Sequence, residues 1–543
     1  MAVYPYSHDD KALVQARVAQ FAEQTERYLA GHIDEERFRP LRLQNGLYIQ
    51  RHAPMLRVSI PYGTLDARQL VRLADIADRE DRGYLHVTTR QNVQFNWIPV
   101  ERIPGVLAQL AEVDMHAIQT SGACIRNLTS DPYAGTLPDE GLDPRVICEV
   151  VRQWATLHPE FAYLPRKFKI AVTGVEADRA AIEVHDIGLR VRGGVDDARV
   201  DVWVGGGLGR TPVIGKLLRR ALPVAELLNY LDAILRVYNL HGRRDNKYKA
   251  RIKILVEAMG LEAFNDAVEA EYGENADARL RVSNEQVARL SEQLKMPIQA
   301  RAEGLLADDP AFQAWYQQNV SSHKVPGYRA VAVILKGHGQ APGDIRADQL
   351  RGLADLGVLH GHDEIRATHD QNFVFPYVPH DQLYDLYQGL VGLELAGANR
   401  GLATDLIACP GLDFCSLANA ESLSVAADIQ AKLAPIEADL GPLEIKISGC
   451  MNACAHHHIG HIGVLGVDKK GEQWYQLTLG GRDQAGAQIG KRLGPAIAKD
   501  AMGDTVLRIA ETYRAGRRDG ESFLNTVDRI GVTPFKEAVY ADH

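Results

Sequence analysis

The chain is internally duplicated, and this repeat constrains its fold more than any other feature. The segment 66–75 reappears as 346–355, an offset of 280 residues that continues without a gap. The same offset joins three further pairs of residues: Thr88 and Thr368, Phe95 and Phe375, Pro99 and Pro379. In each copy, hydrophobic periodicity predicts a strand (56–61 and 331–335), an amphipathic helix with a Gln-Leu pair, and a second strand ending near the shared proline. The repeat therefore predicts an α+β half-domain that is present twice.

A second repeat follows at an offset of 275 residues. It pairs Ile187-Gly188 with Ile462-Gly463, and Gly205-Gly206 with Gly480-Gly481. Two different domains have therefore been duplicated together, which predicts an α+β, duplicated pseudo-twofold architecture. We expect the two half-domains to pair about the pseudo-twofold axis and to leave a shared crevice, because ligands usually bind at such domain interfaces.

The repeats divide the 543 residues into four predicted parts. These are 1–120 (an N-terminal segment and the first half-domain), 121–320 (the first α/β domain and a connector), 321–398 (the second half-domain) and 399–543 (the second α/β domain). The connector is expected in the charged stretch from about 273 to 318, which has helical periodicity. The glycine run 204–210 lacks the third glycine of a dinucleotide-binding fingerprint, because Arg210 stands there. We interpret that run as tight packing after a strand.

Composition excludes several classes of protein. No uninterrupted apolar run is long enough to cross a bilayer, so no membrane span is expected. The first ten residues are acidic and contain a proline, unlike a secretory signal, which predicts a cytoplasmic protein. The net charge of -9 argues against bulk binding of a phosphate backbone, so nucleic acid is not an expected partner.

Four of the six cysteines lie close together in the sequence and indicate a metal site. They form two pairs, Cys409 with Cys415 and Cys450 with Cys454. Thiolates in fours are ligands for iron–sulfur clusters and for structural zinc. The five residues between the first two cysteines exceed the usual spacing of a zinc knuckle, which favours a cluster. A zinc-stabilised α/β protein that binds an anion without redox chemistry is the alternative.

These cysteine pairs, the Ser-Gly before the second pair and the later Ile462-Gly463-Val464 resemble the signature of the sirohaem-dependent nitrite and sulfite reductases. The likeness covers the chain from about Leu41 onward and is greatest to the haemoprotein (beta) subunit of bacterial assimilatory sulfite reductase. It implies two ferredoxin-like half-domains that pair, and two larger α/β domains for sirohaem and a [4Fe–4S] cluster. It also implies that the four cysteines hold the cluster and that Cys454 shares its sulfur with the sirohaem iron. The family usually has an acidic residue before this Ile-Gly pair, where this chain has His461. The first copy keeps Asp186 at the equivalent place, which suggests a structural rather than a catalytic position.

Four basic residues match the oxyanion site of that family by local motif: Arg57, Arg126, Lys167 and Lys169. Sirohaem carries carboxylates and its substrates are anions, so a pocket for both needs arginine and lysine. For any one of these residues alone, surface charge would be the simpler interpretation. Lys167 and Lys169, however, alternate on a predicted strand and should point to the same face.

The segment 88–96 resembles the family's sirohaem-contacting strand. Alternation along a strand would place Thr88, Arg90 and Gln94 on one face. His86 and Asn96 stand where better-known relatives have arginine and histidine, and Asn452 lies between the second pair of cysteines. The predicted sirohaem contacts are Thr88, Arg90, Gln94, His86, Asn96, Asn452 and Cys454.

The resemblance implies the six-electron reduction of sulfite to sulfide in assimilatory sulfur metabolism, with nitrite reduction to ammonia as the alternative. The sequence of the loop 131–135 is more similar to that of nitrite reductases, whereas the sequence of the stretch 450–468 is more similar to that of bacterial sulfite reductases. No flavin or nicotinamide motif is visible. Electrons are therefore expected from a separate protein, either a ferredoxin or an NADPH-dependent flavoprotein.

Two further motifs have no assigned role. The histidine tract 456–461 places His457 and His461 one helical turn apart, but a metal there would need a thiol or carboxylate that is not already committed. The basic run 241–251 is either a solvated helix start or a surface that holds haem carboxylates or docks an acidic electron donor.

Overall fold

The two half-domains exchange edge strands, and this exchange joins the two copies of the repeat. The computed structural model describes residues 6–156, 158–337 and 339–541. The first antiparallel sheet has the order β1 (Leu47–Ile49), β2 (Pro54–Val58), β5 (Val93–Phe95), β4 (Tyr84–Val87), β13 (Asp344–Arg346). The second has the order β11 (Val320–Ser322), β12 (Tyr328–Val333), β15 (Phe373–Pro379), β14 (Ile365–Ala367), β3 (Thr64–Leu65). Each sheet thus ends in a strand contributed by the other copy.

The helices of the half-domains explain the repeated Gln-Leu pair. In α3 (Ala67–Glu80), Asp66 caps the first turn and Gln69 accepts a hydrogen bond from its backbone, while Leu70 is fully buried. The equivalent α11 (Ala347–His360) uses Gln349 and Leu350 in the same places. The two helices pack against each other and share one hydrophobic core that includes both sheets. The predicted pairing of two α+β half-domains is therefore confirmed.

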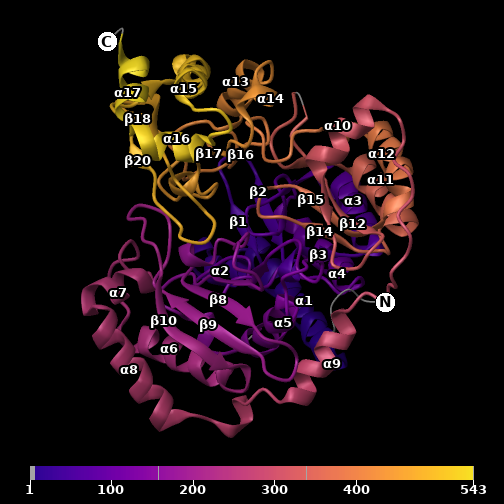
Figure 1. Cartoon of the computed structure of the whole chain (residues 1–543). Coiled ribbons are helices and arrows are strands. Elements are labelled where there is room, and N and C mark those ends of the chain that lie inside the picture. The colour runs from indigo at the N-terminus through magenta and orange to yellow at the C-terminus, as the bar shows by residue number, and fades with distance from the viewer. Residues whose placement is uncertain (1–5, 157, 338, 542–543) are drawn as a thin grey trace.

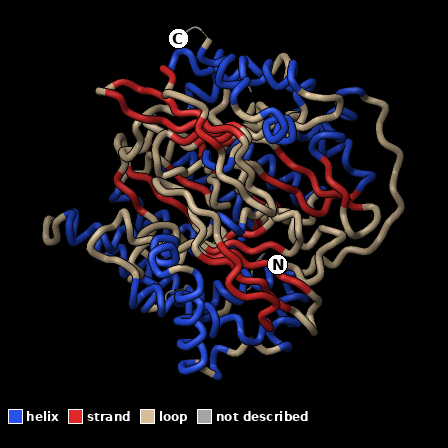
Figure 2. The backbone as a smooth tube through the Cα atoms, turned by 60° about the vertical axis from the view of Figure 1, so that its left-hand side comes forward, coloured by secondary structure: helices blue, strands red, loops and turns tan. Residues whose placement is uncertain are grey.

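Further helices surround the half-domains. They are α1 (His8–Leu29), α2 (Glu35–Gln44), α4 (Ile103–Ala111), α10 (Pro310–Asn319) and α12 (Leu383–Gly392). Figure 1 shows the half-domains between the two α/β domains, with strands β8 to β10 on one side and β16 to β20 on the other. The strands lie mostly inside the molecule and many helices lie at its two ends (Figure 2).

The two α/β domains contain sheets of the same topology. The first runs β10 (Lys216–Pro223), β9 (Arg199–Val204), β8 (Ile187–Arg192), β7 (Ile170–Thr173), β6 (Thr129–Ser130). The second runs β16 (Ile407–Ala408), β17 (Ile445–Ser448), β18 (Ile462–Lys469), β19 (Glu472–Leu479), β20 (Lys491–Arg492), and β21 (Ile497–Ala498) also pairs with β19. In both, the three strands at one edge are parallel and the others antiparallel. Ligand sites of such sheets lie beyond the carboxyl ends of the parallel strands.

Helices cover these sheets and complete the chain. The first domain has α5 (Pro144–Ala155), α6 (Leu227–His241), α7 (Ile252–Met259) and α8 (Leu261–Asn275). The second has α13 (Leu423–Leu433), α14 (Glu437–Leu440), α15 (Met502–Gly516), α16 (Phe523–Ile530) and α17 (Thr533–Tyr540). No helix in the described ranges is long and apolar enough to cross a membrane.

The connector and the glycine run differ in how well the sequence predicted them. Between 273 and 318 the chain forms α9 (Asn284–Leu294) and most of α10, but residues 296–309 are irregular and run along the outside of the molecule (Figure 1).

The glycine run follows β9, and a Cβ at Gly206 would collide with the carbonyl oxygens of Glu183 and His185. Tight packing is therefore confirmed there. The domain boundaries at 120, 320 and 398 stay a prediction.

Candidate active site

The two cysteine pairs lie on loops that leave neighbouring parallel strands. Cys409 directly follows β16, and Cys450 follows β17 with one glycine in between. The Gly449 amide donates to the Cys409 sulfur at 3.2 Å, while its carbonyl accepts from the amides of Asn419 and Ala420. The two loops are therefore held together by hydrogen bonds beyond the carboxyl ends of their strands.

The thiols of these loops interact electrostatically. Burial raises the pKa of Cys409 to about 12 and that of Cys450 to about 11, and repulsion from a Cys454 thiolate acts in the same direction on both. Burial likewise raises the pKa of Cys415. Because metals bind the thiolate form, a positively charged iron–sulfur core would favour ionisation of these three buried or partly buried thiols.

The four predicted oxyanion ligands come from three segments, and the Arg126 cation and a Cys454 thiolate both act on Lys167. Arg57 lies on β2, and its guanidinium donates to Gln94 Oε1 at 3.1 Å and to the Thr120 carbonyl at 3.5 Å. Arg126 precedes β6 and donates to the same Thr120 carbonyl at 2.8 Å. One carbonyl oxygen therefore positions both guanidinium groups.

Lys167 and Lys169 share the charged neighbours Arg251 and Cys454, although the strand predicted for them starts later. They flank Phe168, which is fully buried in the core and forms an isolated bridge with Ile125, whereas β7 begins at Ile170. Burial and the Arg126 cation lower the pKa of Lys167 to about 8, against the opposing attraction of a Cys454 thiolate. Burial and neighbouring cations lower the pKa of Lys169 well below its usual value. These ammonium groups are crowded cations, and an anion placed among them would restore their ordinary ionisation.

The predicted strand face of Thr88, Arg90 and Gln94 is wrong. β4 ends at Val87, β5 begins at Val93, and the chain between them reverses direction with Gln91 at a φ of 53°. The three side chains therefore follow a turn and not an extended segment. Gln94 still reaches the site because it lies on β5, where it contacts Arg57.

Arg90 and the turn around it are tied into the site by hydrogen bonds. The guanidinium donates to the Asn127 carbonyl at 2.6 Å and to Thr129 Oγ1 at 3.0 Å, and it lies 2.6 Å from His185 Nε2. Burial and the Arg126 cation lower the pKa of Arg90 to about 9. Thr88 accepts from the Arg90 amide at 3.2 Å and so stabilises the turn.

Sequence reasoning missed Thr89, which links this turn to the cysteine loop. Its hydroxyl donates to the Cys454 carbonyl at 2.6 Å. It also missed the role of Arg251, whose guanidinium donates to both carboxylate oxygens of the buried Asp186 at 2.8 Å. Asp186 in turn accepts from the Lys169 amide at 2.8 Å. The structural role expected of Asp186 is therefore observed.

Three predicted sirohaem contacts have other neighbours. His86 lies 2.7 Å from Asp344 Oδ1 and 3.1 Å from Gln371 Nε2, so both of its ring nitrogens are used where the half-domains meet. The backbone N–H of Asn96 donates to Asp81 Oδ2 at 2.9 Å. Asn452 lies against the Cys450 thiol, and hydrogen bonds of its backbone and side chain oppose the rise in the pKa of that thiol. We leave His86 out of the proposed cofactor contacts for this reason.

The histidine tract and the basic run divide into separate roles. His457 begins a single 3-10 turn, His457–Ile459, so it does not share a helical face with His461. His458 Nε2 lies 2.9 Å from the Gly209 carbonyl, and the His461 ring accepts from the Glu444 amide at 3.2 Å. In the basic run, Arg243 pairs with the exposed Asp245, and Arg251 enters the site through Asp186.

Two family models match most of this chain. The family model described as "Nitrite and sulphite reductase 4Fe-4S domain" matches residues 121–276 and 403–543, and the "Nitrite/Sulfite reductase ferredoxin-like half domain" matches 48–113 and 323–392. The chain belongs to the nitrite and sulfite reductase family. Within the family it is 30% identical to a sulfite reductase [ferredoxin] of Mycobacterium tuberculosis, over 88% of this chain and 82% of the relative.

Other family members give a consistent picture. A ferredoxin–nitrite reductase of Synechococcus elongatus is 27% identical over 84% of this chain and 85% of its own length. The solved structure of the Mycobacterium tuberculosis NirA protein superposes with a TM-score of 0.76 at 28% identity, covering 93% of this chain and 92% of that one. These matches support the duplicated α+β architecture.

The cofactors of the nitrite and sulfite reductase family are sirohaem and a [4Fe–4S] cluster, and the residues of this chain fit both. Three cysteines are buried or partly buried and Cys454 is exposed, as a ligand shared with a second group requires. The crowded cations beside it suit the carboxylates of sirohaem. Two cavities lie in the described part of the chain, one lined by Thr368 and Glu444 among others and one by Thr89 and His456 among others. Neither lining includes any of the four cysteines or the four predicted oxyanion ligands.

Proposed function

We propose that this protein reduces sulfite to sulfide with six electrons, as an enzyme of assimilatory sulfur metabolism in the cytoplasm. The observation that carries this proposal is that Arg57 and Arg126 share the Thr120 carbonyl, while Lys167 and Lys169 interact with the exposed Cys454. A small oxyanion is the ligand that such a group of cations is suited to bind. The names of the sulfite reductase relatives support the choice of sulfite.

The cysteines Cys409, Cys415, Cys450 and Cys454 would hold the cluster, with Cys454 also facing the sirohaem iron. Arg90, Gln94 and Asn452, together with Thr88 and Asn96, remain proposed contacts of sirohaem. When bound, this cofactor pair supplies the electrons for the reduction. The contribution of the chain is to position the oxyanion and to neutralise its charge.

Arg57 and Arg126 are suited to orient the substrate because the Thr120 carbonyl fixes both guanidinium groups. Lys167 and Lys169 are suited to transfer protons from Nζ, since their lowered pKa values bring an ammonium proton closer to the working pH. Each oxygen that leaves the substrate as water consumes protons. The two lysines are thus the proposed acids and the two arginines the proposed anchors.

Nitrite is the second candidate substrate, because ferredoxin–nitrite reductases are also relatives. The loop 131–135, whose sequence is more similar to that of nitrite reductases, has its hydrogen-bond partners away from the four predicted oxyanion ligands. Its Asp131 accepts from Arg179 at 3.0 Å, and the Pro132 carbonyl accepts from the buried Arg366 at 3.0 Å. This loop joins the first α/β domain to the second half-domain and therefore gives no reason to prefer nitrite.

We propose a ferredoxin as the electron donor, since several relatives are named for it. An NADPH-dependent flavoprotein is the alternative donor. Oxidation of reduced ferredoxin by the holoenzyme in the presence of sulfite would support the first donor. Turnover that requires NADPH and a flavoprotein, with no rate from ferredoxin, would support the second.

Steady-state kinetics with both anions test the proposed substrate. With a small-molecule reductant in place of the donor, kcat/KM for sulfite should exceed kcat/KM for nitrite. A higher value for nitrite would make nitrite reduction the function. No turnover of either anion by protein that contains both cofactors would contradict the proposal.

A further inference from the structure

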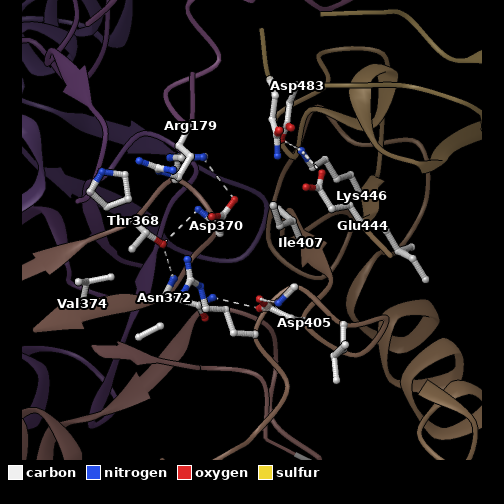
Figure 3. A pocket seen from close by; sticks show the side chains of 18 of the residues that line it. Arg179, Thr368, Asp370, Asn372, Val374, Asp405, Ile407, Glu444, Lys446 and Asp483 are labelled. Atoms are coloured by element: carbon white, nitrogen blue, oxygen red, sulfur yellow. Dashed lines mark hydrogen bonds and ion pairs between the residues drawn. The ribbon is translucent and has the colours of Figure 1, made fainter. Parts of the chain in front are cut away.

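A second cavity occupies the position that the pseudo-twofold axis relates to the oxyanion site. Strand register establishes the equivalence, because Leu56 pairs with Phe95 in the first sheet and Val331 pairs with Phe375 in the second. Arg57 therefore corresponds to Ala332. In the α/β domains, β7 and β17 begin at equivalent residues, so Lys169 corresponds to Glu444. Ala332 and Glu444 both line the cavity shown in Figure 3.

The second crevice keeps the frame of the first but reverses its charge. Thr368 and Asn372 repeat Thr88 and Asn92, and Thr368 accepts from two amides of its turn as part of that frame. The charged positions differ in the second copy. Asp370 replaces Arg90, Val374 replaces Gln94, and Glu444 replaces Lys169. A crevice with these substitutions is not built for an oxyanion or for the carboxylates of sirohaem.

Cations enter this cavity from another side. Arg179 and Arg400 both lie near the ring of Tyr133, with guanidinium carbons 5.6 Å and 4.8 Å from its centroid. Arg179 uses Nε to bind Asp131, and Arg400 uses one terminal nitrogen to bind Ser321. Each guanidinium has five N–H groups, so both keep donors for a carboxylate.

The acidic side of the cavity also has capacity for a ligand. The Asp370 side chain is 42% exposed, and its nearest ion partner is His369 at 3.5 Å. Glu444 lies 3.1 Å from Lys446, which also pairs with Asp483. Burial and the nearby Asp483 raise the pKa of Glu444 to about 8. A ligand ammonium group would therefore be received best at Asp370.

The size and remaining lining restrict the ligand further. The cavity has a volume of about 180 Å³, well above the roughly 10–15 Å³ that a single water needs by the same measure. Apolar side chains complete its wall: Ala332, Val374, Ile407 and Leu443. This lining suits a small molecule with an uncharged side chain.

We propose that this cavity binds a free α-amino acid, with the carboxylate between Arg179 and Arg400, the ammonium group at Asp370, and an uncharged side chain against the apolar wall. Arg179 already pairs with Asp131, whereas Arg400 donates to the uncharged Ser321, so an amine alone would bring no counter-charge to Arg400. An anion alone would bring none to Asp370 beyond His369, whereas a zwitterion brings opposite charges to both sides of the cavity. The lining of this cavity includes none of the four cysteines and none of the four predicted oxyanion ligands, so the proposed ligand is not the substrate of the reduction.

Isothermal titration calorimetry of the holoenzyme tests this proposal with alanine and methionine as ligands. Propionate and ethylamine serve as matched probes, because each keeps only one of the two charged groups of alanine. We expect saturable binding of the amino acids and at least tenfold weaker binding of both probes. Asp370→Asn and Arg400→Gln should each weaken amino-acid binding at least tenfold, which corresponds to about 1.4 kcal/mol.

Asp381→Asn is the matched control, since Asp381 forms an exposed pair with Arg301 outside the cavity; it should bind amino acids like the wild type. Cofactor absorption equal to the wild type identifies variants that have folded correctly. Absence of saturable binding up to about 10 mM would overturn the proposal. So would equal binding of propionate or ethylamine by the wild type, a comparison that needs no variant.

Discussion

At the scale of single residues, Lys167 and Lys169 are the most informative side chains of the site. Both are crowded by cations, and their pKa values are lowered for that reason as well as by burial. Such an arrangement destabilises the charged lysines until an anion arrives. The local motif singled out these residues in the sequence, but it could not reveal their electrostatics, which depend on Arg90 and Arg126 from other segments.

Replacing Lys169 with methionine removes one of these charges and keeps the length of the side chain. Loss of a charged hydrogen bond costs about 1.5–3 kcal/mol, so we expect kcat/KM for sulfite to fall about 10- to 100-fold. The absorption of both cofactors should not change. Lys432→Met is the control, because Lys432 pairs with Asp504 on the surface. Unchanged kinetics of Lys169→Met would contradict the assignment.

The affinity for an anion should depend on pH through Lys167. The pKa of this lysine is lowered to about 8 in the chain itself, and bound anions shift it upward. Below that value the ammonium group is charged, and above it the charge is lost as pH rises. We expect the Kd for nitrite to be constant below about pH 8 and to increase above it.

Spectroscopic titration of the sirohaem with nitrite between pH 6 and pH 10 measures this dependence. Lys167→Arg is the control, since arginine keeps its charge over the whole range and should flatten the profile. Binding that becomes tighter as pH rises would show that this lysine does not neutralise the anion.

At the scale of elements, the turn between β4 and β5 shows where pattern reasoning failed. The family resemblance predicted a strand over 88–96 with Thr88, Arg90 and Gln94 on one face, but Gln91 takes a positive φ and the chain reverses. Gln91 can do so because its side chain donates to the Ala367 carbonyl at 3.2 Å and accepts from the Ser130 amide at 2.9 Å. These partners are distant in sequence, so local periodicity contains no sign of them.

The exchanged strand β3 depends on Gly63, which precedes it with a φ of 79°. A Cβ at this position would collide with the Ala367 carbonyl oxygen. Gly63→Ala should therefore lower the free energy of unfolding by about 2–4 kcal/mol, from left-handed backbone strain and overpacking together.

Gly31→Ala is the matched control, because Gly31 has a φ of 75° but a Cβ there would meet no atom within 4 Å. It should cost only the backbone strain of about 1–2 kcal/mol. Thermal unfolding of both variants measures the difference. Equal losses would mean that close packing at Gly63 contributes nothing to the exchange of β3.

At the scale of the whole molecule, the repeat predicted the duplication but not the way the copies are joined. The offsets of 280 and 275 residues identified two half-domains and two α/β domains in the right order. The exchanged strands β3 and β13 contain only two and three residues. Segments so short have no recognisable period, so their exchange was not predictable from the sequence.

Because of this exchange, the first half of the chain should not fold alone. A fragment of residues 1–320 lacks β13 and α11, which complete its sheet and cover α3. We expect this fragment to show no cooperative thermal transition by circular dichroism. Co-expression with residues 321–543 should restore one. Cooperative unfolding of the first fragment by itself would contradict the view that the half-domains share one core.

The central claim is that four cysteines and a group of cations hold sirohaem and a [4Fe–4S] cluster at Cys454. Metal analysis combined with the visible spectrum of the purified chain tests it most directly. The claim predicts about five iron atoms per chain, with the absorption of a reduced tetrapyrrole, and loss of both features in Cys454→Ser. A colourless, fully active protein that contains zinc and no iron would contradict it.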